Sequence, residues 1–310
     1  MGLDSEIAGV LYTKAPRGDA APLVFDSPHS GTVAPLDFGA VAPADALRNS
    51  RDSFVDDLFR DAPDYGAYLQ AALFPRAYID PNRSLRDIDP RMLEEPWPGP
   101  VTAGDKTHYG HGLVWRLCPP NHEMYDHKLS VAAVRRRIDE YWRPYHGHLS
   151  DAIFSTRQRF GQVWHLNCHS MPSTSAPGEG AVGQADFVLG DRDGATCSPG
   201  FTHWVGETLR AMGYVVRVND PYKGVELVRA YSDPAAGHHS LQIEINRAIY
   251  MDEIRCERHQ GFEPLRADLG RLMAGMRDYA RDAIAGMSEV DRARGDSAGD
   301  SAGTRARTAL

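Results

Sequence analysis

The chain has 310 residues, of which 42% are hydrophobic and 25% charged, and this is enough to bury one large core in one or two domains. Its formal net charge of -8 argues against a nucleic-acid partner, because such binding needs a basic face. No run of 18 apolar residues predicts a membrane span, and the four well-separated cysteines suggest neither a disulfide framework nor a thiolate zinc site. The N-terminus has no export signal, so we expect a cytoplasmic protein.

Predicted strands and helices alternate along the chain. Short β-branched or aromatic runs bounded by turn residues predict strands at 22–26, 76–80, 112–117, 162–168, 185–190, 213–218 and 240–245. Helical patterns lie between them, at 52–60, 65–73, 121–160, 200–212 and 256–287. Pro144 should kink or split the longest helix, because proline has no N–H to donate. The alternation predicts an α/β fold with a mixed or mostly parallel sheet flanked by helices.

We expect one domain over residues 1–288. From residue 289 onward the chain has almost no large apolar side chain and repeats the letters GDSAGDSAG. Such a segment cannot bury enough surface to order itself, so residues 289–310 are predicted to be a disordered tail.

Two histidines stand where predicted strands end. His29 follows the apolar run that begins at Val24, in DSPHSG, and His169 ends the run HLNCHSM. In open α/β sheets ligands bind beyond the carboxyl ends of the strands, so the two imidazoles can share one metal ion. Taken singly, however, each histidine is better explained as a surface or hydrogen-bonded structural residue.

A catalytic zinc ion is commonly held by two histidines and one carboxylate, with a fourth position left for water. The segment RDSFVDDLF offers Asp52 as the first candidate for the acidic ligand and Asp56 as the second, since both would share one helical face. The structural alternative for Asp52 is an ordinary residue at a helix N-terminus, where the macrodipole favours an acid.

Glu244 is the strongest single candidate for a catalytic group. It lies within the alternating segment LQIEINR, and a charged residue in the middle of a core strand is costly unless it is paired or functional. Beside a metal-activated water it can take a proton and later return it. The alternative is an ion pair with Arg247 on an edge strand.

Cationic and amide side chains near the same strand ends suit an acidic substrate. Asn82 and Arg83 follow the second predicted strand and Arg247 follows the last, and guanidinium groups hold carboxylates through paired hydrogen bonds. His239 is a secondary candidate for substrate binding. Surface salt bridges with nearby aspartates are the alternative, which we favour for Arg86.

Seven motifs in the same order resemble the N-formylglutamate amidohydrolase family over roughly residues 20 to 285: SPHSG, RDSFVDDLF, IDPNRS, NCHSM, VLGDRDGATCS, NDPYKG and HHSLQIEINRAIYMDE. The resemblance implies a phosphorylase/hydrolase-like α/β fold related to zinc carboxypeptidases and aspartoacylase. It also implies one zinc ion, or another divalent metal, held by His29, His169 and an acid in the segment 52–56, in which Asp52 ranks before Asp56. Where the family pattern usually has an aspartate two residues before the second histidine, this chain has Asn167, which can orient the imidazole without raising its basicity.

The activity implied is hydrolysis of a small anionic substrate, N-formyl-L-glutamate, to formate and glutamate, a step of histidine degradation. Glu244 would be the general base and Arg83 would stabilise the oxyanion, while Asn82, Arg83 and Arg247 would hold the substrate carboxylates. The alternatives are an amidase for another small N-acyl amino acid or peptide, and a non-catalytic metal-binding relative. The sequence gives no indication of the oligomeric state.

Overall fold

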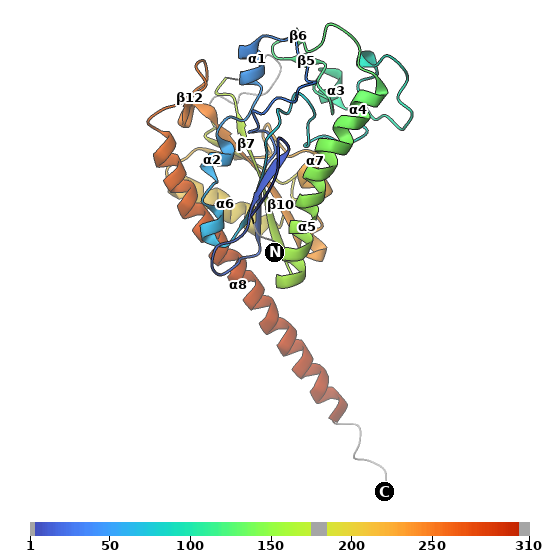
Figure 1. The fold of residues 1–310 in the computed structure, drawn as a ribbon. Coiled ribbons are helices and arrows are strands. Elements are labelled where there is room, and N and C mark those ends of the chain that lie inside the picture. Colours follow the sequence, from blue (N-terminus) through green and yellow to red (C-terminus); the bar gives the residue numbers. More distant parts are fainter. Residues whose placement is uncertain (1–3, 175–184, 304–310) are drawn as a thin grey trace.

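An eight-stranded mixed sheet runs through the centre of the protein (Figure 1). The computed structural model describes the backbone of residues 4–174 and 185–303, and the side chains of these residues up to 286. The strand order is β1-β2-β4-β3-β7-β10-β8-β9. The strands are β1 (Ser5–Ile7), β2 (Leu11–Lys14), β3 (Leu23–Ser27), β4 (Tyr68–Ala72), β7 (Val163–Met171), β8 (Phe187–Gly190), β9 (Val216–Val218) and β10 (His238–Asn246).

The four central strands β4, β3, β7 and β10 are parallel, whereas β8 pairs with β10 in the antiparallel direction. The carboxyl ends of these four strands therefore meet at one edge of the sheet, which is where ligands bind in folds of this kind. In the register of β7 and β10, His169 lies opposite Glu244 and Asn167 lies opposite Gln242.

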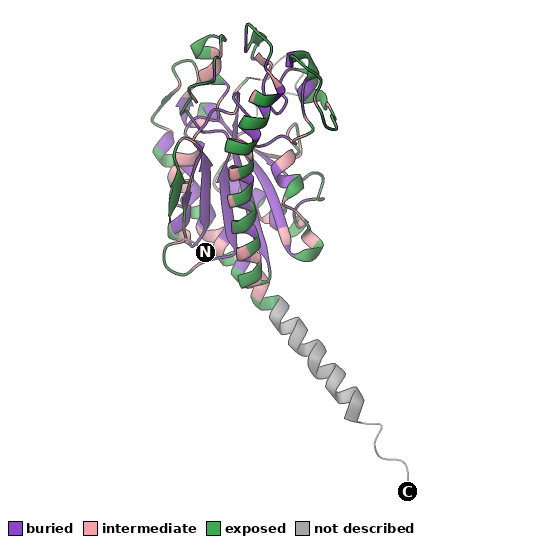
Figure 2. Ribbon diagram, turned by 45° about the vertical axis from the view of Figure 1, so that its right-hand side comes forward, coloured by how far each residue is buried: buried purple, intermediate pink, exposed green. Residues whose placement is uncertain are grey.

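Helices cover both faces of the sheet (Figure 1). One face packs against α2 (Val55–Leu58), α6 (Pro199–Ala211) and α8 (Phe262–Gly303), and the other against α5 (Arg143–Phe160) and α7 (Glu226–Ala230). The central strands are buried on both faces, as Figure 2 shows, and so carry apolar residues without a regular polar alternation. The remaining α-helices are α1 (Ala44–Asn49), α3 (Asp105–His108) and α4 (Val131–Arg137), and the remaining strands form the short pairs β5 (Leu117–Cys118) with β6 (His122–Glu123) and β11 (Met251–Asp252) with β12 (Glu257–Arg258). Short 3-10 helices cover Ala62–Tyr65, Pro90–Met92, Pro234–Ala236 and Arg247–Ile249.

The long helical region is interrupted where the sequence predicts. A π-helical turn, Ile138–Trp142, joins α4 to α5, and Pro144 lies in the first turn of α5. Pro144 has no N–H to donate, and the wider hydrogen-bonding pattern of the π-helical turn directly before it lets the helix continue past the proline. The wider turn places Trp142, Tyr145 and His146 so that all three contact the sheet or the loop beyond it, through Trp142 to Arg83, Tyr145 to Asp26 and His146 to Pro81.

The architecture confirms the predicted single α/β domain with a mixed, mostly parallel sheet flanked by helices. Several element predictions are wrong. Residues 65–73 hold strand β4 instead of a helix, because a strand buried on both faces lacks the alternation that identifies strands. Residues 76–80 form a turn, and in 112–117 only Leu117 belongs to a strand. Strands β1 and β2 were not predicted.

Predicted helix boundaries also shift. The predicted helix over 52–60 is only the four residues of α2, that over 121–160 begins at Val131, and that over 256–287 begins at Phe262. The backbone of α8 continues to Gly303, and the side chains of residues 287–303 and all of 304–310 lie outside the described part. The disordered tail over 289–310 therefore stays a prediction. Among the described residues, no helix is both long and apolar enough to cross a membrane.

Candidate metal centre and active site

Three buried side chains converge at the carboxyl edge of the sheet. His29 follows β3, His169 lies near the end of β7, and Asp52 lies in the loop before α2. One potential ligand atom from each of the three lies within 4.8 Å of the others. The Asp52 Oδ2 is 3.3 Å from His29 Nδ1 and 2.9 Å from His169 Nδ1. The structure thus brings together the three residues that the sequence suggests as metal ligands.

The far side of each imidazole is held by a hydrogen-bond acceptor. His29 Nε2 is 2.7 Å from Asp80 Oδ1, and His169 Nε2 is 2.7 Å from Asn167 Oδ1. Histidines that bind metals through one nitrogen characteristically donate the other N–H to a carboxylate or carbonyl oxygen, which fixes the ring and its tautomer. Both Nδ1 atoms are therefore left to face the Asp52 carboxylate.

Two arginines hold the Asp52 carboxylate from the opposite side. Arg247 Nη2 donates to Asp52 Oδ1 at 3.2 Å, and Arg76 Nη1 is 3.7 Å from the same oxygen. Burial alone raises the pKa of Asp52, but hydrogen bonds from His169 and His29 and the charges of His29 and Arg76 lower it well below its ordinary value. Asp52 is thus an ionised, oriented carboxylate.

Two imidazole nitrogens and one carboxylate oxygen, converging and buried, form a donor set that fits zinc or a similar divalent ion. Asp56, the alternative acidic ligand, points elsewhere: its carboxylate accepts a hydrogen bond from Tyr12 and its backbone N–H donates to Ser30 Oγ. The reason is local. Phe54 adopts a left-handed conformation (φ 67°), which places Asp52 before α2 instead of on its face.

Glu244 lies on β10, beside His169 on β7. Its Oε1 accepts a hydrogen bond of 3.0 Å from Gln242 Nε2. Burial, and then repulsion by the Asp52 charge, raise the pKa of Glu244 from 4.5 to about 8, although Arg76 and Arg247 oppose the shift. A carboxyl group tuned to this range and placed beside a potential metal site has the properties of a general base.

The predicted substrate-binding residues Asn82, Arg83 and Arg247 have different surroundings in the structure. Asn82 lies at the site, with its Nδ2 3.2 Å from His169 Nε2 and its Oδ1 accepting from Leu227 N–H. Arg83 is buried, and its Nε and Nη1 donate to the backbone carbonyls of His111 and Asn82. The guanidinium of Arg247 instead donates to Ser170, Asn49 and Asp52, and it therefore positions the Asp52 carboxylate.

His239 does not join the site. It lies at the amino end of β10, opposite Trp164 on β7, whereas Glu244 lies near the carboxyl end of the same strand. Five residues of strand span about 17 Å. His239 instead stacks on Trp164 and bonds Gln162. The prediction that it binds substrate is therefore corrected: strand direction separates it from the other candidates.

Sequence reasoning missed two residues of the site, Arg76 and Asp80. Arg76 donates through Nε and Nη2 to Asp80 Oδ2, and Asp80 bonds His29 and the backbone N–H of Asn82. The sequence pattern predicts a strand over 76–80, where the structure has this turn. The position of Asp80 at the head of DPNRS was the one available signal, whereas nothing in the sequence distinguishes Arg76 from the other arginines.

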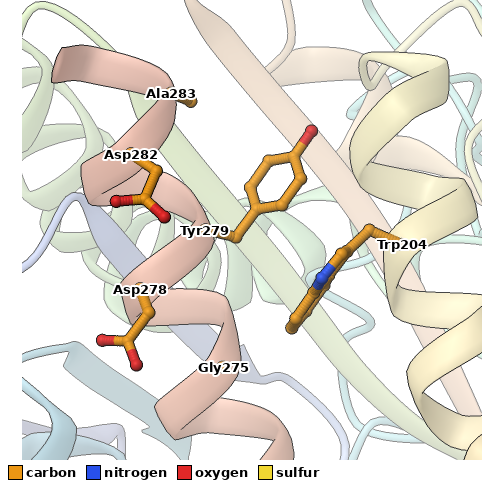
Figure 3. A pocket seen from close by; sticks show the side chains of 6 residues that line it. All are labelled: Trp204, Gly275, Asp278, Tyr279, Asp282 and Ala283. Carbon is orange, nitrogen blue, oxygen red and sulfur yellow. The ribbon is translucent and has the colours of Figure 1, made fainter. Parts of the chain in front are cut away.

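A separate groove of about 460 Å³ lies on the surface between α6 and α8 (Figure 3). Trp204 and Tyr279 line it, and Gly275 allows the close approach, because a Cβ there would lie 2.8 Å from the Trp204 ring. No residue of the metal centre lines this groove. It is therefore a feature of helix packing apart from the candidate active site.

An α/β domain that gathers two histidines, an aspartate and a perturbed glutamate at its strand ends has the composition of a hydrolase. The chain belongs to the N-formylglutamate amidohydrolase family, which its residues 21–251 match. This confirms the resemblance seen in the sequence motifs.

Curated and solved relatives agree with this assignment. The N-formylglutamate deformylases of Pseudomonas putida and Pseudomonas aeruginosa are 31% and 29% identical over 238 residues, covering 75% of this chain and 82% and 83% of theirs. The crystal structure of N-formylglutamate amidohydrolase from Ralstonia eutropha JMP134 is 49% identical, with a TM-score of 0.84 over 89% of this chain and 99% of that one. A protein from Agrobacterium tumefaciens, at 18% identity and a TM-score of 0.63, shares the fold.

Proposed function

We propose that the protein hydrolyses N-formyl-L-glutamate to formate and L-glutamate in a metal-dependent reaction. The observation that carries the proposal is the convergence of His29, Asp52 and His169 beside Glu244. The names of the relatives support the choice of substrate, since two are N-formylglutamate deformylases and one is an N-formylglutamate amidohydrolase.

His29 Nδ1, His169 Nδ1 and Asp52 would hold the ion, for which zinc suits the donor set best. When bound, zinc supplies Lewis acidity that activates water and offsets negative charge developing on the formyl oxygen. Asp80 and Asn167 keep both rings oriented for this task, and Arg247 keeps Asp52 in place. The protein thus contributes a prepared and buried set of ligands.

Glu244 is assigned the proton transfers. It accepts the proton of the attacking water and then delivers it to the nitrogen of the departing glutamate, so the C–N bond breaks without leaving an amide anion. Gln242 fixes the Glu244 carboxyl through its hydrogen bond to Oε1. The high pKa of Glu244 favours holding the proton between the two transfers.

The substrate carries two carboxylates, and Arg83 with Asn82 is the proposed binding pair. The guanidinium of Arg83 is fixed by its Nε and Nη1 bonds, and its Nη2, which makes no hydrogen bond to the described residues, would bind a carboxylate. Arg76, between Asp52 and Asp80, adds positive charge close to the reacting carbonyl.

Purified protein is tested by metal analysis and by hydrolysis of formyl, acetyl and longer acyl derivatives of glutamate and aspartate. We expect a divalent ion in the wild type and in Glu244→Gln, with hydrolysis by the variant slower by ~10²- to 10⁴-fold. Glu140→Gln, which removes an exposed carboxylate, is the matched control and should keep full activity. Absence of a metal requirement, or an unchanged rate in Glu244→Gln, would contradict the proposal.

A further inference from the structure

His111 lies in the loop between α3 and β5, next to the arginine proposed to bind a substrate carboxylate. Its backbone carbonyl accepts a hydrogen bond of 2.9 Å from Arg83 Nε. An isolated β-bridge pairs His111 with Trp115, and the centres of their two rings are 4.6 Å apart. The loop is therefore fixed against Arg83 through its backbone and against Trp115 through the imidazole ring.

Trp115 connects this loop to the metal centre. Its indole Nε1 donates to Asp80 Oδ2 at 3.4 Å, and the other oxygen of that carboxylate is 2.7 Å from His29 Nε2. The guanidinium carbon of Arg76 lies 5.1 Å from the centre of the indole ring. His111, which packs on the same indole, thus lies at the margin of the candidate active site.

The imidazole of His111 makes no hydrogen bond within the described part of the chain, and the residue is partly exposed. Burial, and then the positive charges of Arg76, Lys106 and Arg83, lower the pKa of His111 from 6.5 to about 4, against the opposing charge of Asp80. At pH 7 the ring is therefore uncharged, and it offers one N–H to a ligand.

The surroundings of this N–H suit an anion. Three cationic side chains act on the His111 ring, in a protein whose formal net charge is -8. One of them, Lys106, also acts on Glu244, so the positive charge extends to the proposed general base. A carboxylate bound here would accept the imidazole N–H and be attracted by the cations, whereas a cationic ligand would be repelled.

Burial separates the places available to the two carboxylates of N-formylglutamate. Asn82 and Arg83 are 2% and 5% exposed and lie as deep as the proposed metal ligands, whereas His111 is closer to solvent. With the formyl group at the metal ligands, the α-carboxylate stays close to them, within reach of Asn82 and Arg83. The side-chain carboxylate extends further outward, toward His111.

We propose that His111 is a specificity-determining residue, whose imidazole N–H donates a hydrogen bond to the side-chain carboxylate of the substrate. The inference rests on the proposed hydrolysis of N-formylglutamate. It gives the two carboxylates different partners, with Arg83 and Asn82 holding the α-carboxylate. The alternative is a structural role, in which His111 only accepts from Arg83 through its carbonyl and covers Trp115 with its ring.

The variant His111→Phe keeps an aromatic ring against Trp115 and the backbone carbonyl, but it removes the N–H. With N-formyl-L-glutamate we expect kcat/KM to fall ~10- to 100-fold, mainly through a higher KM, because a hydrogen bond to a charged group is lost. N-formyl-L-norvaline has no side-chain carboxylate, so its kcat/KM, or its inhibition constant where turnover is slow, should be the same in both proteins.

Two further variants of the same residue separate substrate binding from packing. His111→Gln restores an N–H donor and should recover most of the preference for glutamate over norvaline. His111→Met has a similar length and no donor, should not recover it, and carries the test with His111→Gln if His111→Phe does not fold. His122→Phe, which replaces an exposed histidine on β6, is the control and should keep the preference of the wild type.

Three outcomes would overturn the inference: an unchanged preference in His111→Phe, an equal loss with both substrates, and a folded His111→Gln protein that is no better than His111→Met. An equal loss would show that His111 acts only through the position of Arg83. Failure of the wild type to hydrolyse N-formylglutamate would refute the proposed function, and the role of His111 with it.

Discussion

The buried carboxyl group of Glu244 makes the stability of the metal-free protein depend on pH. Its pKa of about 8 in the folded state compares with an ordinary value of 4.5, so the folded protein holds a proton that the unfolded chain has lost. Stability rises with pH only where the unfolded state binds more protons, and here the reverse holds. The contribution of Glu244 is therefore fully present below pH 4.5 and is lost as the pH rises through about 8.

The size of the effect follows from the shift. Each pKa unit corresponds to ~1.4 kcal/mol, so moving from 4.5 to about 8 gives at most about 5 kcal/mol. Water penetration and local rearrangement reduce this, and we expect a loss of a few kcal/mol. Glu244→Gln has no titrating group at position 244, so this variant should not show that loss of stability as the pH rises.

Urea unfolding of metal-free wild type and Glu244→Gln, with a chelator present, measures the difference at pH 5, 7 and 9. Subtracting the two curves removes the contributions of the titrating groups that do not interact with Glu244. The variant should become the more stable of the two as the pH rises. Parallel pH curves for the two proteins would refute the argument that burial and Asp52 raise the pKa of Glu244.

Three other substitutions test the assigned positions. Gln242→Leu should lower kcat about tenfold with little change in KM, because the base loses its hydrogen bond; an unchanged kcat would mean that Glu244 is held by other contacts. His239→Gln should leave both kinetic constants of N-formylglutamate hydrolysis unchanged, and a raised KM would restore the abandoned substrate-binding role. Gly275→Ala should cost ~1–3 kcal/mol of unfolding free energy through collision with Trp204, measured by denaturant titration against the exposed Gly286→Ala as control.

The sequence was most informative where strands end. His29, His169 and Glu244 were identifiable because polar side chains at the ends of apolar runs have few structural explanations, and parallel strands bring such ends together. Choosing Asp52 over Asp56 needed the structure, since the left-handed backbone at Phe54 is not visible as a pattern. From the sequence alone, Asp52 and Asp56 are both predicted to lie on one helical face.

Other parts could not be derived because their signals are not local. Asp80 and Arg76 belong to one turn, and their role is visible only once the fold brings that turn against His29, which Asp80 contacts. Strand β4 was hidden because burial on both faces removes alternation. His239 was misplaced because its sequence neighbourhood, close to Glu244, says nothing about the distance along an extended strand.

The π-helical turn at Ile138–Trp142 is the point in this helical region where the loss of one residue should be tolerated best. It holds one residue more than a regular α-helical turn, and α5 begins directly after it. Deleting one residue there would leave an ordinary α-helical turn, so α5 would keep nearly its present rotation and Tyr145 its contact with Asp26. The same deletion in the regular turns of α5 before Tyr145 would rotate the rest of the helix by about 100° and remove that contact.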